Sequence, residues 1–148
     1  MEKFLTISRG EWSLQQTINE ISLNSIRHVK HNISIEPQRG SGGIGYKIEY
    51  LRGHRLFSFE TVSETRKKMG VIRETINISS SSAPIGIFEF IDDLTVITYI
   101  RYQNWDIEEK FQIVNTGLCI SSSKVKKYGE LIATSFTSGI KSLALKPE

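Results

Sequence analysis

Alternating apolar and polar positions dominate the middle of the chain and predict β-strands there. The segment Tyr46-Lys47-Ile48-Glu49-Tyr50 alternates strictly, and so does Ile33-Ser34-Ile35-Glu36 before it. Short polar loops, among them the acidic turn Asp92-Asp93, separate such segments. Because consecutive strands joined by short loops pair antiparallel, the pattern predicts a meander. The expected strands are residues 32–37, 44–52, 54–63, 69–80, 85–91 and 94–103, after a first short strand at 4–7.

Both ends of the chain show a different spacing, which predicts helices. Trp12, Leu14, Ile18 and Ile21 recur at roughly helical steps and favour a helix over 11–22, followed by a shorter one over 23–31. The last third predicts one long amphipathic helix over 118–144. Its apolar stripe recurs every three or four residues and consists of Val125, Tyr128, Ile132, Phe136, Ile140 and Leu143.

The glycines of Gly40-Ser41-Gly42-Gly43-Ile44-Gly45 spell the GxGxxG pattern of dinucleotide-binding loops. That pattern holds a pyrophosphate only where a helix opens directly after it, because the free N–H groups of the helix terminus bind the phosphates. Here alternating segments stand on both sides. We therefore expect a turn between two strands and no nucleotide site.

Length and composition indicate a single globular domain covering residues 1–148. Hydrophobic residues make up 39% and charged residues 24% of the chain. No apolar run approaches the roughly 20 residues of a membrane-spanning helix. The single cysteine, Cys119, excludes an intrachain disulfide. These features, with an N-terminus that lacks a signal-like apolar run, lead us to expect a cytoplasmic protein.

The net charge of +3 is too small to indicate a nucleic-acid partner. Basic residues nevertheless cluster at 27–31, at Arg66-Lys67-Lys68 and at 124–127. Solvated loops and helix faces account for such clusters, and a transient contact with an anionic membrane surface is the alternative.

Residue types with catalytic or metal-binding chemistry show no productive spacing. His28, His31 and His54 lack a third ligand at metal-binding spacing and are interpreted as surface residues. Cys119 is interpreted as a buried, inert thiol, although the start of a helix lowers thiol pKa values. No nucleophile motif of the GxSxG type occurs. We predict no catalytic residue, no metal and no cofactor, and enzymatic activity stays an open alternative.

The order of expected elements and two motifs resemble a known superfamily. The loop at residues 40–45 resembles the GxGGxG loop of the Bet v 1 group, and the hairpin from Ile85 to Tyr99, with its Asp92-Asp93 turn, resembles the penultimate hairpin of the wider superfamily. The chain thus resembles the START and Bet v 1-like helix-grip proteins, which include polyketide cyclases and lipid-binding proteins. It also resembles a small archaeal fatty-acid-binding branch. The implied fold is α+β, a curved antiparallel sheet of about seven strands around a long C-terminal helix, in the order β-α-α-β6-α.

The resemblance implies an apolar cavity between the sheet and the last helix, which would bind or carry a hydrophobic small molecule such as a fatty acid. Arg101, if inward-facing and free of a Glu74 partner, would hold the acidic head group. A cyclase- or hydratase-like enzyme and a protein-interaction module with a collapsed cavity are the alternatives. The expected ligand-binding residues are Tyr46, Ile48, Tyr50, Phe57, Phe59, Ile76, Phe88, Phe90, Tyr99, Arg101, Ile132 and Phe136.

Overall fold

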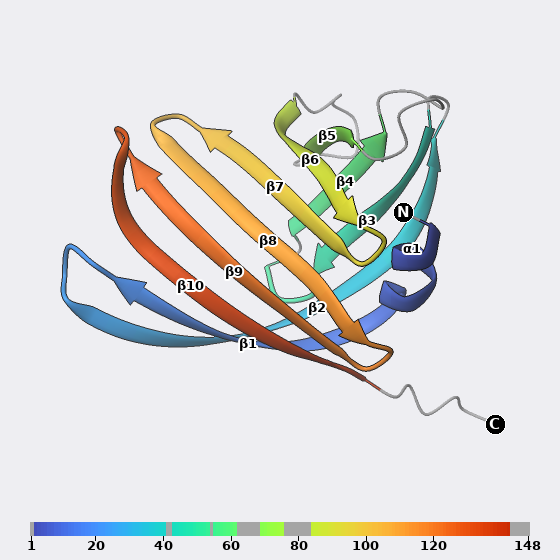
Figure 1. Cartoon of the computed structure of the whole chain (residues 1–148), viewed down its shortest axis with the longest axis horizontal. Helices are drawn as coiled ribbons and strands as arrows, with labels where there is room; N and C mark the ends of the chain where they lie inside the picture. The colour runs from blue at the N-terminus through green and yellow to red at the C-terminus, as the bar shows by residue number, and fades with distance from the viewer. Residues whose placement is uncertain (1, 41–42, 54, 62–68, 76–83, 143–148) are drawn as a thin grey trace.

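Ten antiparallel strands and one short helix make up the chain in its computed structural model, which describes residues 2–40, 43–53, 55–61, 69–75 and 84–142 (Figure 1). The helix α1 comes first and covers Glu2–Ser8. The strands are β1 (Gly10–Glu20), β2 (Ser25–Gly40), β3 (Gly43–Tyr50), β4 (Arg55–Thr61), β5 (Met69–Thr75), β6 (Pro84–Asp92), β7 (Thr95–Tyr102), β8 (Trp105–Asn115), β9 (Leu118–Lys127) and β10 (Glu130–Lys141).

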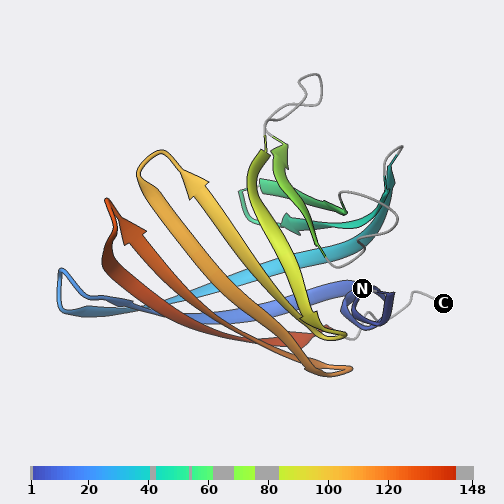
Figure 2. The same ribbon diagram turned by 45° about the horizontal axis from the view of Figure 1, so that its top comes forward.

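The strands form one closed barrel in which each strand pairs with its neighbours in sequence. Closure comes from β1, which pairs with β2 on one side and with β10 on the other. Thr17, for example, lies opposite His28 of β2 and Phe136 of β10. Every strand is therefore paired on both sides, which removes the exposed edges that an open sheet would present. Figure 2 shows the strands curving round into a barrel, with α1 at one end and the β1–β2 hairpin at the other.

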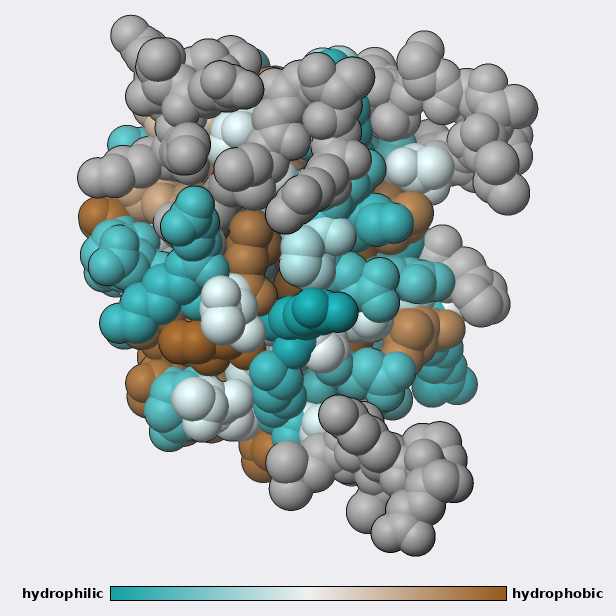
Figure 3. Space-filling model, turned by 90° about the vertical axis from the view of Figure 1, so that its right-hand side faces the viewer, coloured by the Kyte–Doolittle hydropathy of each residue, from teal (hydrophilic) through white to brown (hydrophobic). Residues whose placement is uncertain are grey.

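Side chains alternate between the barrel interior and the outer surface, as the period of a strand requires. In β1, Trp12 and Leu14 point inward and are buried, whereas Ser13 and Gln15 are exposed. In β9, Cys119, Ser121 and Ser123 are buried and Ser122 and Lys124 are exposed. The side of the molecule that carries α1 and β2–β4 shows mainly hydrophilic residues with small apolar patches among them (Figure 3).

Helix α1 closes one end of the barrel. Phe4 and Leu5 are buried in the core, and Ile7 packs against them. The end of the helix is held by two donors, because Lys141 Nζ donates to the Ile7 carbonyl at 2.7 Å and Trp12 Nε1 donates to the Ser8 carbonyl at 2.7 Å. A cation suits this position since the last carbonyls of a helix carry partial negative charge. Gly10, at a φ of +129°, then turns the chain into β1.

The helices expected over 11–22 and 23–31 are wrong, because these residues form β1 and the first part of β2. Trp12, Leu14 and Ile18 fit a period of two once Gln16 is recognised as a fourth inward position. This polar residue on the inner face interrupts the apolar alternation, so the sequence pattern does not reveal the strand. The short strand expected at 4–7 is also wrong, since these residues belong to α1.

The long C-terminal helix expected over 118–144 is wrong as well, and with it the α+β helix-grip fold. Residues 118–127 and 130–141 are the paired strands β9 and β10. Phe136 and Ile140 are four residues apart and share the exposed outer face of β10. A spacing of four residues returns to the same face in a strand and nearly so in a helix, so the apolar stripe did not distinguish the two structures.

The middle of the chain follows the expected meander. The glycines at 40 and 43 lie opposite each other where β2 ends and β3 begins, so the prediction that this segment joins two strands is confirmed. Residues 41 and 42 lie outside the described part. The acidic turn is also confirmed, and Asp92 Oδ1 accepts a hydrogen bond from the Leu94 N–H at 2.9 Å.

Candidate functional site

The half of the barrel interior next to α1 is filled by aromatic side chains. The rings of Tyr46 and Phe59 stack at 4.4 Å between centroids, and Phe4 lies 5.2 Å from Phe90 and 5.8 Å from Phe111. Phe88 is 1% exposed. Aromatic pairs in such edge and stacked arrangements stabilise a core beyond the area that they bury. This half is therefore a packed core and leaves a ligand only the other half.

The half toward the open end contains a hydrogen-bonded row of polar side chains. His31 Nε2 lies 3.0 Å from Gln16 Oε1, and Gln16 Nε2 donates to Ser135 Oγ at 3.1 Å. Ser135 in turn is hydrogen-bonded to Ser123 Oγ. The row crosses the wall from β2 through β1 and β10 to β9. Such groups reduce stability when buried without partners, and here they supply one another with partners.

Glu109 of β8, the strand next to β9 in the wall, projects into the same interior and is the register partner of Ser123. Burial raises the pKa of its carboxyl group, and a hydrogen bond with Ser121 acts in the opposite direction. Its charge also acts on its neighbours. Burial first, and the charge of Glu109 second, raise the pKa of Tyr50 and of the Cys119 thiol to about 12. Burial lowers the pKa of His31, which favours the neutral imidazole.

A small cavity is lined by Glu109 and by His31 and Gln16 of the polar row. It has a volume of about 60 Å³, room for a few water molecules. Its lining combines this acid and the row with apolar and aromatic groups: Leu14, Gln16, His31, Ile33, Ile48, Tyr50, Glu109, Phe111, Cys119, Ser121 and Thr137. A larger molecule has to extend from here into the open end. Among the described residues, no three His, Cys, Asp or Glu side chains form a cluster suited to a metal ion.

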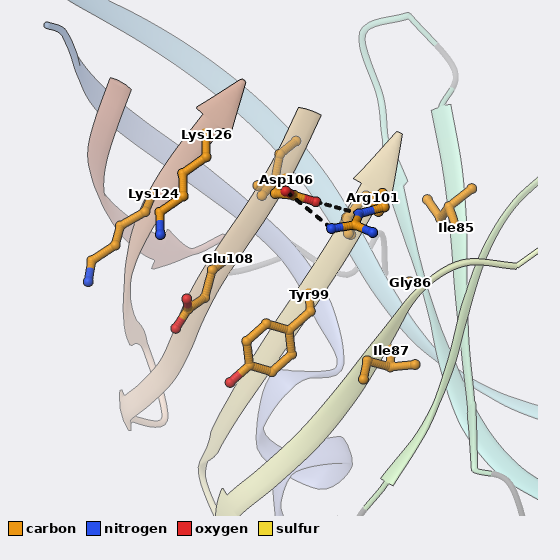
Figure 4. A pocket seen from close by; sticks show the side chains of 11 residues that line it. Ile85, Gly86, Ile87, Tyr99, Arg101, Asp106, Glu108, Lys124 and Lys126 are labelled. Carbon is orange, nitrogen blue, oxygen red and sulfur yellow. Dashed lines mark hydrogen bonds and ion pairs between the residues drawn. The ribbon is translucent and has the colours of Figure 1, made fainter. Parts of the chain in front are cut away.

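The second concave region is a groove of about 510 Å³ on the outer face of β6–β9 (Figure 4). Ile87 and Tyr99 form its apolar side, and Lys124 and Lys126 lie at the other side. Between them Arg101 pairs with Asp106, with 2.7 Å between Nε and Oδ1. This groove is open to solvent, and Asp106 and Glu108 offset two of its three positive charges.

The expected ligand-binding residues fall into three groups. Tyr46, Phe59, Phe88 and Phe90 belong to the packed aromatic core. Ile48, Tyr50 and Phe57 are half-buried on the inner wall, and the first two line the interior cavity. The remaining ones lie elsewhere: Tyr99, Arg101 and Phe136 are exposed on the outer face, Ile132 is half-buried, and Ile76 lies outside the described residues.

Arg101 and Glu74 do not meet. The Arg101 side chain is 79% exposed and pairs with Asp106, whereas Glu74 accepts a hydrogen bond from Arg55 Nε at 2.9 Å. Arg55 also lies 5.1 Å above the ring of Phe57. The head-group role of Arg101 stays a prediction.

The residues that sequence reasoning missed are the polar groups of the interior, above all Gln16, His31 and Glu109. A signal for two of them exists. Val29, His31, Ile33 and Ile35 alternate, which places the histidine on an apolar strand face. Likewise Trp105, Ile107, Phe111 and Ile113 alternate with Glu109 in the central position. That second strand was not expected at all.

Comparison with known proteins finds similarity of structure without similarity of sequence. No protein-family model matches the chain, and no curated protein matches it significantly. Among solved structures, the S-type phycobiliprotein lyase CpeS from Guillardia theta is similar with a TM-score of 0.68 at 14% identity, covering 97% of this chain and 93% of that one. A protein of unknown function from the DUF3598 family of Nostoc punctiforme has a TM-score of 0.63 at 9% identity, covering 93% of this chain and 49% of that one.

These likenesses concern the fold, and they overturn the resemblance drawn from the sequence. Both neighbours match nearly the whole ten-stranded chain. Up-and-down barrels of this kind include the lipocalins. The START, Bet v 1-like and helix-grip assignment is therefore wrong, since it rested on a C-terminal helix that is absent where residues 118–141 are described. The two short motifs that carried the resemblance occur here in ordinary antiparallel hairpins.

Proposed function

We propose that the protein binds a small amphipathic organic molecule in the open half of the barrel, with Glu109 as the polar anchor. The observation that carries this proposal is the position of Glu109, a carboxylate inside a barrel that lines the same small cavity as His31 and Gln16 of the hydrogen-bonded row. A carboxyl group at such a position reduces stability unless a partner compensates it. Ionisable groups whose pKa values are shifted, and which line a concave site, are typical of binding sites.

The chemistry of the interior favours a ligand with N–H donors or a positive charge. Glu109 accepts hydrogen bonds when ionised. Burial disfavours this charged form and raises the pKa of the carboxyl group, and a donor or cation on a ligand would offset that effect. The half-buried rings of Tyr50, Phe57 and Phe111 supply flat apolar contacts beside it. A linear tetrapyrrole has both features, and the fold likeness to a phycobiliprotein lyase makes it the first ligand to test.

A fatty acid is the second candidate, supported by Arg55 at the open end. Its guanidinium lies over Phe57, where it would pair with a carboxylate in exchange for Glu74. The acyl chain would then enter the interior beside Tyr50. The two candidates make opposite demands on the site, since one requires the acid at position 109 and the other the base at position 55.

Titration of the purified protein with biliverdin and with palmitate, followed by tryptophan fluorescence, tests the proposal. For biliverdin we expect Glu109→Gln to raise the Kd about tenfold, because a hydrogen bond to a charged group is lost. Glu108→Gln is the matched control, since the neighbouring side chain faces the outer groove and its loss leaves the interior unchanged.

The outcomes separate the sites. The proposal would be refuted if the Kd for biliverdin were unchanged in Glu109→Gln but higher in Glu108→Gln. That result would place the ligand in the outer groove. Binding of palmitate that Arg55→Gln weakens, with no binding of biliverdin, would establish the second candidate in place of the first. Uptake of neither probe, and no small molecule in native mass spectra of the purified protein, would support the interaction module.

A further inference from the structure

Two neighbouring hairpins at the open end of the barrel carry large apolar side chains in solvent. The β1–β2 turn presents Leu23, which is 71% exposed, and beside it lies Ile26, which is 67% exposed. Tyr128, at the β9–β10 turn, is 76% exposed. The hairpins are adjacent because β1 pairs with β10, and Ile21 N–H donates to the Ile132 carbonyl at 2.9 Å. We call the apolar side chains of these two hairpins the hairpin patch: Ile21, Leu23, Ile26, Tyr128 and Leu131.

The hairpin patch continues into a basic surface on the outer face of the same strands. Ile26, Asn19, Thr134 and Lys124 follow one another across β2, β1, β10 and β9, and Lys126 lies opposite Leu131. Lys30 of β2 is exposed on the same face. Among residues 15–21, 26–30, 122–126 and 131–136 of these strands the one carboxylate is Glu20, which pairs with Arg27 at 3.3 Å and adds no net charge.

Carboxylates lie at the margins of this surface. Glu130 is opposite Lys127 at the β9–β10 turn, and Asp106 and Glu108 are opposite Lys126 and Lys124 on β8. They offset part of the positive charge without reversing it, because Arg101, Lys30 and the three lysines of β9 outnumber them. The surface therefore combines exposed apolar tips with a moderate positive potential.

We infer that the hairpin patch docks the open end of the barrel on an anionic lipid bilayer, with Leu23 and Ile26 inserted at the level of the head groups. Apolar patches that remain exposed at this scale mark interaction sites. The shape decides between a bilayer and a protein partner. The β1–β2 hairpin projects beyond the neighbouring strands (Figure 1). Projecting apolar tips flanked by lysines enter a lipid interface, whereas protein interfaces centre on well-packed pockets.

Docking in this orientation would place the mouth of the barrel near the membrane, so that an amphipathic ligand could pass between the two. This consequence rests on the proposed function, but the affinity for lipid does not. The test can therefore use ligand-free protein, and Glu109→Gln is expected to bind vesicles as the wild type does.

Co-sedimentation with vesicles of phosphatidylcholine alone and of phosphatidylcholine with phosphatidylglycerol tests the inference. We expect pelleting with the mixed vesicles, weakened by salt, and an approximately tenfold weaker partition for Leu23→Ser/Ile26→Ser. Ile91→Ser is the matched apolar control, since Ile91 is 55% exposed at the closed end of the barrel. Lys30→Ser/Lys126→Ser should weaken binding, and Lys3→Ser on α1 should not.

Three results would overturn the inference. Failure of both vesicle types to retain the wild type would leave the patch to a protein partner. Equal losses in Leu23→Ser/Ile26→Ser and Ile91→Ser would remove the role of the hairpins. Loss only in the lysine variants would show adsorption by charge without insertion. Circular dichroism of each variant verifies the fold, and all substituted side chains are exposed.

Discussion

Glu109 is the residue on which the chemistry of the barrel interior depends. Burial first, and the charge of Glu109 second, raise the pKa of Tyr50 and of Cys119, so this charge acts on both sides of the cavity. Glu109 lies on the strand face that Ile107, Phe111 and Ile113 make apolar. A carboxylate at an inward position of an otherwise apolar face reduces the stability of the fold and is typical of a group retained for a function.

The raised pKa of Glu109 makes stability depend on pH in a defined direction. The folded state holds the proton more tightly than the unfolded chain, so the stabilisation is complete below the unfolded pKa and is lost as the pH rises through the folded pKa. Glu109→Gln removes that loss. We therefore expect the stability of the variant relative to wild type to increase as the pH rises above the pKa of an unperturbed glutamate, about 4.3.

Urea unfolding at a series of pH values measures this effect. Glu108→Gln removes the same charge from the outer face and serves as the reference. A stability difference for Glu109→Gln that does not grow with pH relative to this reference would contradict desolvation of the interior carboxyl group.

At the scale of the elements, α1 depends on a contact from the far end of the chain. Lys141 of β10 donates to the Ile7 carbonyl and lies 5.7 Å above the ring of Trp12. A seven-residue helix is too short to be stable by itself. Its place in the closed end therefore comes from Phe4 and Leu5 in the core and from this lysine.

Lys141→Met tests that dependence. We expect a loss of about 1 to 2 kcal/mol in the free energy of unfolding, because a partly buried charged hydrogen bond disappears while the aliphatic packing remains. In the variant, amide hydrogen exchange should accelerate relative to wild type, and the acceleration should be larger in α1 than in β1. Lys110→Met, on the exposed face of β8, is the control. Equal exchange in α1 for both variants would refute the capping role of Lys141.

At the scale of the whole molecule, pairing of β1 with β10 closes the barrel. Leu14 lies opposite Gly139, and a side chain at 139 would meet Leu14 Cδ2 and Cys119 Sγ, each at 2.5 Å from its Cβ. The absent side chain lets β1, β9 and β10 curve together.

No helix among the described residues is long and apolar enough to cross a membrane.

NMR spectra offer a direct measurement of closure. We expect cross-strand NOEs from Thr17 to Phe136 and from Leu14 to Gly139, because these residues are register partners across the β1–β10 pair. Residues 26–30, which the sequence pattern predicts to be helical, serve as a control. They should show the strong sequential Hα–amide NOEs of a strand. Strong sequential amide–amide NOEs along 118–141 would instead indicate a helix and contradict the barrel.

The sequence by itself determined the central strands, their antiparallel order and the turn at Asp92-Asp93. Strict alternation and turn residues are local signals, and they acted at residues 44–50 without help from the rest of the chain. The alternation also placed Ile48 and Tyr50 on one face of a strand, and both line the interior cavity, while their role in ligand binding stays a prediction.

Only the tertiary structure decided the two ends of the chain and the polar site. In β9 and β10 the inward positions are small or polar, such as Ser121 and Gly139, while Phe136 is exposed. The usual apolar-inside rule therefore selects the wrong face. Whether Gln16, His31 and Glu109 lie together depends on the register of strands far apart in sequence. Register and closure are properties of the completed barrel, and a single segment does not contain them.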